Sequence, residues 1–444
     1  MTSADQELPP GEAAPELLDG RLWVDGCFDF FHHGHAGAIV QARQLGDELY
    51  IGVHSDEAIL ENKGPTVMNL EERLSAVDAC RWATRSVPNA PYVTQLDWIS
   101  HFGCRYVVHG DDITSDGSGE DCYRFVKAAE RFKVVKRTPS ISTTDLVGRM
   151  LLCTKTHFIR SLQAALAGKE GPGTDAERKA TGEAMAERIR LYATDETAKN
   201  PGAEVWVWKA DPRATAPTSK PTKLVAGKGP QIGQRVVYVD GGFDLFSSGH
   251  IAFLQRVLKA EEERARADGW YAPEAVAERR GKAAGDYPPA YVVAGVHDDE
   301  VINEWKGINY PIMNIFERGL CVLQCKYVDA VVFGAPFTPV RDYLAALPWG
   351  IPDAVYHGPT AFMPLTYDPY TEPKAMGIYQ QVGPHQFADV NAETIVARIL
   401  ASRDRYEARQ RAKGAKSDVE EAHKRREKMV EEQRQKEAAA AATT

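Results

Sequence analysis

The sequence predicts an α/β protein with two similar domains, each a parallel sheet with helices on both faces. Short apolar segments alternate along the chain with segments of helical periodicity, which is the pattern of a buried parallel sheet. At 444 residues the chain is too long for one ordinary domain. A stretch at residues 24–35 also returns in altered form at residues 239–250, which indicates that the same unit occurs twice.

Composition and periodicity divide the chain into five parts. They are a disordered lead-in (1–20), a first α/β domain (21–153), a linker (154–234), a second α/β domain (235–402) and a charged helical or disordered tail (403–444). The linker mixes basic residues with Gly, Pro, Ala and Thr, and one helix is expected within it, near Asp175 to Tyr192.

The first half of the first domain contains two predicted strands. Leu22 to Asp25 is a short apolar strand, and Gly26 begins the turn after it. Gly34 to Leu45 fits a helix because its apolar residues fall on one face. Glu48 to His54 has the apolar composition of a second buried strand. Asn69 can cap the helix that follows.

The second half of the first domain continues the alternation. Arg105 to His109 is a buried strand that runs into Gly110-Asp111-Asp112. Tyr123 to Phe132 is predicted to be helical and Val134 to Lys136 to be a strand, and a loop leads to a helix from about Asp145 to Leu152. Polar residues gather at the carboxyl ends of these strands, which is where parallel sheets bind their ligands.

The second domain repeats the first over several separate motifs. The matched pairs are Gly52 to Glu57 with Gly295 to Glu300, Lys63-Gly64 with Lys306-Gly307, Met68-Asn69 and Glu72-Arg73 with Met313-Asn314 and Glu317-Arg318, Ala90-Pro91-Tyr92 with Ala335-Pro336-Phe337, and His109-Gly110 with His357-Gly358. A charged stretch, Glu261 to Pro289, is inserted in the second copy. Units of this size indicate a duplicated domain.

Two predicted helix starts in the first domain carry groups that suit phosphate. His32 and His35 stand one helical turn apart at a helix N-terminus, where backbone N–H groups and the helix dipole favour anions. Ser142-Thr143-Thr144-Asp145 caps a second helix, and Arg137 precedes it. Lys63 adds a mobile cation. This set suits a polyphosphate and in-line displacement at phosphorus, with Mg²⁺ carried on a nucleotide.

These motifs resemble those of a known family. His32-x-Gly34-His35 is similar to the HxGH signature of the nucleotidyltransferase superfamily, and Arg137 to Asp145 resembles the RTxGIST(S/T)D signature of cytidylyltransferases. The tandem arrangement with its long linker resembles the ethanolamine-phosphate cytidylyltransferases over nearly all of residues 20–410. Choline-phosphate cytidylyltransferases are similar in the catalytic domain, but they have one such domain followed by a long amphipathic membrane helix. The resemblance implies two Rossmann-like nucleotidyltransferase domains, of which the first is catalytic.

The resemblance also implies a reaction and roles for individual residues. CTP and phosphoethanolamine would give CDP-ethanolamine and pyrophosphate, a step of phosphatidylethanolamine biosynthesis. Catalysis is assigned to His32, His35, Lys63 and Arg137. CTP binding is assigned to Gly26, Cys27, Phe28, Asp29, His32, Gly34, His35, Arg137, Ser142, Thr143 and Thr144. Substrate binding is assigned to Lys63, Tyr92, Gly110 and Asp111, of which the carboxylate and the aromatic ring suit an ammonium head.

The motifs depart from the family pattern at several positions. Ser140 stands where the first domain should have the family glycine. Ser247 replaces the first signature histidine in the second domain, and Val390-Asn391-Ala392-Glu393 replaces the Thr-Thr-Asp cap. We therefore predict that the second domain does not catalyse. It either supports the first domain or binds nucleotide weakly through Gly242, Phe243, Gly249, His250, His357 and Gly358.

Composition excludes several other classes of protein. A net charge of -9 argues against nucleic acid as a partner, and no apolar run is long enough to cross a bilayer. The seven cysteines lack CxxC spacing, so neither a metal site nor a disulfide framework is expected. No Ser-His-Asp order or acidic pair is evident, so hydrolysis through a protein nucleophile is not expected.

Several alternatives stay open from the sequence. The expected partners are CTP and phosphoethanolamine, but phosphocholine and glycerol 3-phosphate are rival substrates of the same chemistry. A non-catalytic nucleotide-binding scaffold is the rival from another class. The expected location is the cytoplasm, with peripheral association with the endoplasmic reticulum as an addition, and a homodimer is one of the open oligomeric states.

Overall fold

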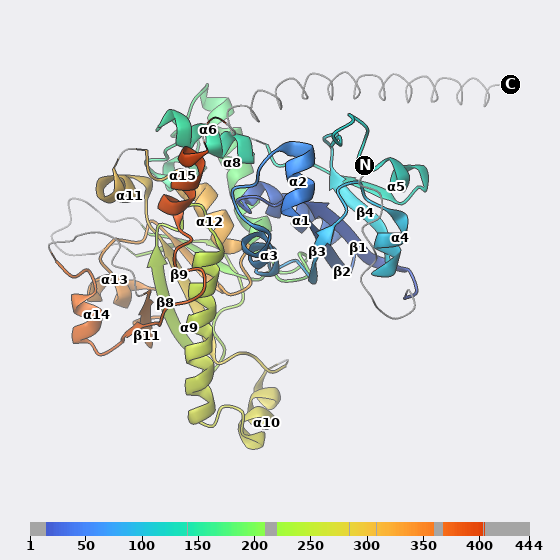
Figure 1. Cartoon of the computed structure of the whole chain (residues 1–444). Helices are drawn as coiled ribbons and strands as arrows, with labels where there is room; N and C mark the ends of the chain where they lie inside the picture. The colour runs from blue at the N-terminus through green and yellow to red at the C-terminus, as the bar shows by residue number, and fades with distance from the viewer. Residues whose placement is uncertain are drawn as a thin grey trace.

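The described residues form two α/β domains side by side, as the fold class predicted (Figure 1). This computed structural model describes residues 15–139, 141–208, 220–283, 285–307, 309–358, 367–402 and 404. The predicted tail therefore lies almost wholly outside the described residues, as do Ser140 and most of the lead-in. No described helix has the length and apolar composition that a membrane span requires.

The first sheet has five parallel strands in the order β3-β2-β1-β4-β5. The strands are β1 (Leu18–Gly26), β2 (Glu48–His54), β3 (Arg85–Ala90), β4 (Cys104–Gly110) and β5 (Phe132–Val135). The helices are α1 (His33–Gln44), α2 (Asp56–Lys63), α3 (Leu70–Asp78), α4 (Leu96–His101), α5 (Arg124–Ala128) and α6 (Thr143–Leu152). β1 starts inside the predicted lead-in, because the Leu18 amide bonds to the Gly103 carbonyl oxygen. The predicted helix at 123–132 is shorter, since β5 already begins at Phe132.

The second sheet has seven strands in the order β12-β11-β8-β9-β10-β6-β7. Its strands are β6 (Glu204–Val207), β7 (Thr222–Val225), β8 (Arg235–Gly241), β9 (Ala290–Val296), β10 (Ala330–Phe333), β11 (Ala354–His357) and β12 (Tyr379–Gln381). The five strands from β8 to β12 repeat the order of the first sheet, which supports the predicted duplication.

The predicted linker contributes two strands to this second sheet, so the sheet begins before residue 235. β6 pairs in parallel with β10 and extends the sheet past the edge that β3 forms in the first domain. β7 is antiparallel to β6, so the second sheet is not purely parallel as predicted. The short apolar strand β6 pairs with the backbone N–H and C=O groups at the open edge of β10. The sequence did not indicate this strand, because the composition around it is rich in Gly and Pro.

The linker and the second domain also supply the remaining helices. They are α7 (Leu162–Leu166), α8 (Asp175–Tyr192), α9 (Ser248–Ala267), α10 (Pro273–Lys282), α11 (Asp299–Lys306), α12 (Ile315–Leu323), α13 (Arg341–Ala346), α14 (Thr371–Ala375) and α15 (Ala392–Ala401). α8 has the predicted bounds. The insertion at 261–289 forms the end of α9 and then α10, which project away from both sheets (Figure 1).

Equivalent elements of the two domains meet each other at the domain interface. α1 packs on α12, and the equivalent pair, α3 and α9, also packs together. At the centre the backbones of Cys80 and Cys325 pair antiparallel, where the Arg81 amide donates to the Gln324 carbonyl oxygen at 2.7 Å and the Lys326 amide to the Ala79 carbonyl oxygen at 2.9 Å. One apolar core runs through both domains. The arrangement is that of a two-fold dimer joined in one chain.

Buried histidines in both domains predict sensitivity to acid. Burial lowers the pKa of His33, His250 and His297 to about 4, below the ordinary value of 6.5. Because the folded pKa is lower than the unfolded one, the stability that these neutral rings provide is complete above pH 6.5 and is lost as the pH falls toward 4. At pH 5 each ring is expected to cost roughly 2 kcal/mol relative to pH 7.

The measurement is thermal unfolding at pH 7 and at pH 5. The His297→Asn variant is the matched test, because its amide can still donate to the Ala335 carbonyl oxygen, which lies 3.0 Å from His297 Nδ1. Because three such rings contribute, we expect the loss of stability that they cause between the two pH values to shrink by about a third in this variant. An unfolding temperature of the unsubstituted protein that does not change over this range would contradict the prediction.

Candidate functional site

A turn with unusual backbone geometry connects β1 to α1. Phe28 and Phe30 have φ angles of 56° and 49°, in the left-handed region that bulky residues rarely occupy. Asp29 stands between them in the sequence, and its carboxylate accepts hydrogen bonds from the Val67 and Met68 amides, at 3.0 and 2.9 Å. Asp29 thus holds the turn against the loop before α3, a structural role that the sequence did not indicate. Its predicted contact with CTP stays a prediction.

The two signature histidines lie together at the start of α1. His32 is the N-cap, and its Nδ1 accepts the Gly34 amide at 3.0 Å. His35 Nδ1 accepts the His32 amide at 3.4 Å, and the ring centroids are 3.9 Å apart in a stacked arrangement. Since each Nδ1 accepts an N–H group, each neutral ring carries its proton on Nε2 as a donor. The side chain of Phe28, which is buried, packs edge-on against the His35 ring.

The second helix start that is predicted to bind phosphate, at Ser142 to Asp145, lies next to the first, which carries His32 and His35. Ser142 is the N-cap, and its hydroxyl accepts the Asp145 amide at 3.0 Å. Ile141, one residue earlier, lies over Gly34, where an added Cβ would come within 2.7 Å of Ile141 Cγ2. Only glycine fits there. The fold therefore brings together two helix N-termini that are more than a hundred residues apart in the sequence.

Arg137 and two aspartates border the α6 motif. The Arg137 guanidinium is half-exposed and pairs with Asp112 at 3.3 Å. The Arg137 amide donates to Asp111 Oδ1 at 3.1 Å. The structure thus places Asp111, predicted to contact the substrate, against the loop that carries Arg137, and Gly110 ends the neighbouring strand β4.

Lys63 and Tyr92 form another group of predicted residues. Lys63 ends α2, and its Nζ is 5.7 Å from the centroid of the Tyr92 ring. Burial is the main cause of a lowered pKa at His54 and His109, and the nearby charge of Lys63 lowers both further. His54 ends β2 and His109 lies near the end of β4, so Lys63 is close to the carboxyl ends of both strands. This is the expected ligand edge of a parallel sheet.

Arg73 is a central residue that sequence reasoning did not assign to the site. Its side chain is buried and donates to the carbonyl oxygens of Met68, Cys27 and His54, at 3.1, 2.7 and 2.8 Å, and to Asp56 Oδ1 at 2.6 Å. Arg73 thereby joins the ends of β1 and β2 to α3. The second domain repeats the arrangement with Arg318. The one sequence feature that could have indicated this role is the recurrence of the pair Glu72-Arg73 as Glu317-Arg318.

The second domain has the same backbone arrangement, but other groups of the second domain contact the positions that correspond to the start of α1 and to Lys63. The Ser247 hydroxyl donates to the Val390 carbonyl oxygen at 3.2 Å, and that oxygen would lie 2.1 Å from a Cβ at Gly249. Lys306, the counterpart of Lys63, is buried and pairs with Glu393 at 3.5 Å, in the first turn of α15. A carbonyl oxygen and a carboxylate thus stand where the first domain has the groups that are predicted to bind phosphate.

Other predicted residues of the second domain keep the geometry of the first. Phe243 has a φ of 50°, as Phe28 does, and follows Gly242 in the turn after β8. His250 Nδ1 accepts the Ser247 amide at 3.2 Å, and His357 Nδ1 lies 2.8 Å from the Gly358 carbonyl oxygen. These contacts show a shared scaffold, and the weak nucleotide binding predicted for this domain stays a prediction.

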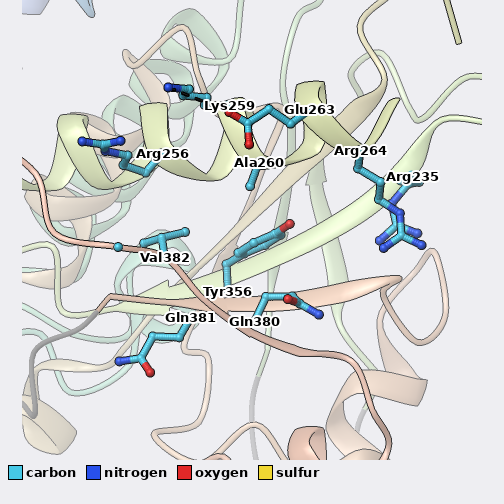
Figure 2. A pocket seen from close by; sticks show the side chains of 11 residues that line it. Arg235, Arg256, Lys259, Ala260, Glu263, Arg264, Tyr356, Gln380, Gln381 and Val382 are labelled. Carbon is cyan, nitrogen blue, oxygen red and sulfur yellow. Dashed lines mark ion pairs between the residues drawn. The ribbon is translucent and has the colours of Figure 1, made fainter. Parts of the chain in front are cut away.

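A groove of about 380 Å³ lies elsewhere in the second domain, between α9 and the strands β11 and β12 (Figure 2). It is lined by Arg235, Arg256, Lys259, Ala260, Glu263, Arg264, Tyr356, Gln380, Gln381, Val382 and Gly383. None of the predicted site residues lines this groove. Within the described part of the chain, no three His, Cys, Asp or Glu side chains lie together as ligands for a metal ion.

Comparison with known proteins shows where this chain belongs. Residues 23–149 match the family described as Cytidylyltransferase-like. The ethanolamine-phosphate cytidylyltransferase of Mus musculus is 39% identical over 400 residues, which cover 89% of each chain. The enzyme of that name from Dictyostelium discoideum is 38% identical over 407 residues, which cover 89% of this chain and 95% of the relative. The chain belongs to the ethanolamine-phosphate cytidylyltransferase family.

Similarity to the choline enzymes is confined to part of the chain. Choline-phosphate cytidylyltransferase A of Rattus norvegicus is 38% identical over 152 residues, which cover 34% of this chain and 41% of that protein. The ethanolamine-phosphate cytidylyltransferases match this chain across both domains. The match to the choline-phosphate enzyme is only about as long as the first domain. The resemblance stated from the sequence motifs, including the tandem domains, is therefore confirmed.

Proposed function

We propose that the first domain transfers CMP from MgCTP to phosphoethanolamine, which gives CDP-ethanolamine and pyrophosphate. The observation that carries this proposal is the meeting of the α1 and α6 N-termini at Gly34 and Ile141. That contact places the histidine pair beside the second phosphate motif. Membership of the ethanolamine-phosphate cytidylyltransferase family, over nearly nine-tenths of the chain, supports the choice of substrate.

The reaction is an in-line displacement at the α-phosphorus of CTP. An oxygen of the phosphate monoester forms the new P–O bond, and the bond from the α-phosphorus to the bridging oxygen of the β-phosphate breaks. His32 and His35 donate through Nε2–H to the CTP phosphates as charge shifts toward the leaving group. No protein nucleophile is required, so the chain acts by positioning the reactants and neutralising charge.

The α6 end of the site receives the leaving pyrophosphate. The Thr143 and Thr144 amides lie in the first turn of α6, and amides of this turn point toward an anion at the helix N-terminus. Arg137 is half-exposed and exchanges its ion pair with Asp112 for the β- and γ-phosphates. Mg²⁺ bound to the nucleotide would neutralise further phosphate charge. Chelation of Mg²⁺ is therefore expected to stop turnover and its replenishment to restore it.

Lys63 and Tyr92 serve the incoming phosphoethanolamine. The Lys63 ammonium bridges the substrate phosphate and CTP, and the ring of Tyr92 lies beside it. The face of an aromatic ring attracts a small ammonium head, so we place the ethanolamine end near Tyr92. Asp111 follows β4, which β2 and β1 separate from β3, and we assign its charge to the same head group.

Substrate choice is tested by CTP turnover with three phosphate esters. Phosphoethanolamine is expected to have a kcat/KM at least about tenfold above those of phosphocholine and glycerol 3-phosphate, because one misplaced or missing head-group contact costs about 1–3 kcal/mol. The Tyr92→Leu variant should lose most of this preference while it keeps its KM for CTP. A preference for either rival ester would overturn the substrate assignment, and a protein that turns over none of them would overturn the proposed activity.

We further propose that the reaction takes place in the cytoplasm. All seven cysteines are free thiols, and five of them are buried. Burial raises the pKa of Cys80 and of Cys325 to about 12, so these thiols stay protonated and unreactive. Free thiols of this kind suit a reducing compartment.

A further inference from the structure

An arginine near the end of α6 binds the second domain. Arg149 donates through Nη1 to Glu317 Oε2 at 2.7 Å and through Nη2 to Glu317 Oε1 at 2.9 Å, which makes a two-pronged ion pair. Nη1 also donates to the Ile312 carbonyl oxygen at 3.1 Å. Nη2 also bonds to Asp145 Oδ2 at 2.9 Å. Arg149 therefore connects the second domain to the first turn of the helix that is proposed to hold pyrophosphate.

The acceptor in the second domain is itself firmly placed. Glu317 is the third residue of α12, where its carboxylate accepts the Asn314 amide at 2.9 Å in a capping box. The side chains of Arg149 and Glu317 are only 12% and 7% exposed. Burial alone would raise the pKa of Glu317, but the hydrogen bonds and charge of Arg149 outweigh it and bring that pKa below its ordinary value. Both groups are therefore charged at neutral pH.

The segment after α6 is also held by the second domain. Lys155 Nζ bonds to Asn303 Oδ1 at 3.0 Å, His157 Nε2 lies 2.9 Å from the Pro311 carbonyl oxygen, and the Ile159 amide donates to Asp299 Oδ2 at 2.9 Å. By contrast, the buried residues of α6 are the apolar Leu146, Val147 and Met150. Apolar contacts are not directional, so the polar bonds to the second domain set the rotation and position of α6.

The equivalent contact, with the roles of the two domains exchanged, exists on the other side of the interface. Arg398 of α15 donates to both carboxylate oxygens of Glu72 at 2.8 Å and to the Val67 carbonyl oxygen at 3.3 Å. Glu72 caps α3 as Glu317 caps α12. Each domain therefore sends one arginine to the capping carboxylate of the other. The two contacts differ in the helix that carries the arginine, because α6 starts at the candidate site and α15 starts where Glu393 pairs with Lys306.

We propose that Arg149 and Glu317 are positioning residues for CTP, through which the second domain fixes the phosphate-binding start of α6. This inference rests on the proposed function of the first domain. The second domain then contributes to turnover by positioning α6, with the Glu317 carboxylate as its main contact and no chemistry of its own. It also explains why a domain without the signature histidine retains an intact α12 cap and a buried ion pair facing α6.

The test compares matched variants on the two sides of the interface. Arg149→Ala and Glu317→Gln are expected to raise the KM for CTP about tenfold, with a KM for phosphoethanolamine that changes less than about threefold. The double variant should be no worse than Arg149→Ala alone, because both changes break the same contact. Arg149→Lys should recover only part of the loss, since an ammonium cannot make the two-pronged bond. Arg398→Ala is expected to leave the KM for CTP within about twofold of the unsubstituted value.

A second readout does not depend on activity. Hydrogen exchange of the amides at residues 141–148 should become faster in Arg149→Ala and in Glu317→Gln and stay unchanged in Arg398→Ala. Glu317→Gln keeps an acceptor for the Asn314 amide, so it serves if Arg149→Ala does not fold. Equal rises in the KM for CTP from Arg149→Ala and Arg398→Ala would overturn the inference. Failure of the proposed function is distinct, because the unsubstituted protein would then be inactive.

Discussion

Replacing His35 with alanine is expected to lower kcat by about 100- to 1,000-fold, the usual cost of removing one donor aimed at developing charge. The change also removes the Nδ1 acceptor of the His32 amide at the start of α1. Loss of a helix cap costs about 1 kcal/mol of stability, which the large core can absorb. Kinetics at saturating CTP and phosphoethanolamine, together with the unfolding temperature, separate the two effects.

The second domain provides a matched control for His35. His250 accepts the Ser247 amide through Nδ1 at 3.2 Å and stacks on the Phe246 ring, so His250→Ala removes an equivalent cap. We expect this variant to retain most of the activity. His35→Asn is a second control, because its side-chain oxygen can replace Nδ1 as acceptor, whereas its amide donors do not reach the position of Nε2–H. It should be as inactive as His35→Ala, and equal losses from His35→Ala and His250→Ala would contradict the division of labour.

The parts of the fold that could be predicted are those in which local pattern and tertiary environment agree. β2 and α8 have their predicted bounds, because a continuous apolar run and a capped helical period have few alternative structures. The strand β3, Arg85–Ala90, received no prediction. It contains Pro88 and few buried residues, which an edge strand tolerates but which resembles a loop in sequence. Tertiary pairing at the sheet edge therefore decided its structure.

In the candidate site, too, one part could be predicted from the sequence and another could not. The meeting of the α1 and α6 motifs followed from one rule, because the carboxyl ends of parallel strands share one edge of the sheet. The partners of individual side chains did not follow. The acceptors of Arg73 lie on three different segments, and Arg149 binds across the domain interface. Sequence periodicity places a residue on a face of its helix, but it does not identify what packs against that face.

Removal of Arg73 is expected to be among the most destabilising single changes in the chain. Arg73→Ala leaves the buried carbonyl oxygens of Met68, Cys27 and His54 without their donor and takes the ion partner from Asp56. Breaking a buried charged network by removing one partner costs about 3–5 kcal/mol. Arg73→Lys should recover little of this, because one ammonium cannot reach acceptors on the three segments that the planar guanidinium joins.

The equivalent change in the second domain distinguishes folding from activity. Arg318→Ala removes the same set of bonds, to Met313, Gly242, His297 and Asp299, from a similarly buried position. Both variants should lower the unfolding temperature by a similar amount. In the protein that remains folded, Arg73→Ala should also lose turnover, since the turn at Cys27 carries residues that are predicted to line the nucleotide, whereas Arg318→Ala should retain its kcat at saturating CTP. Loss of kcat to the same extent in both folded variants would show that the two sites are not functionally separate.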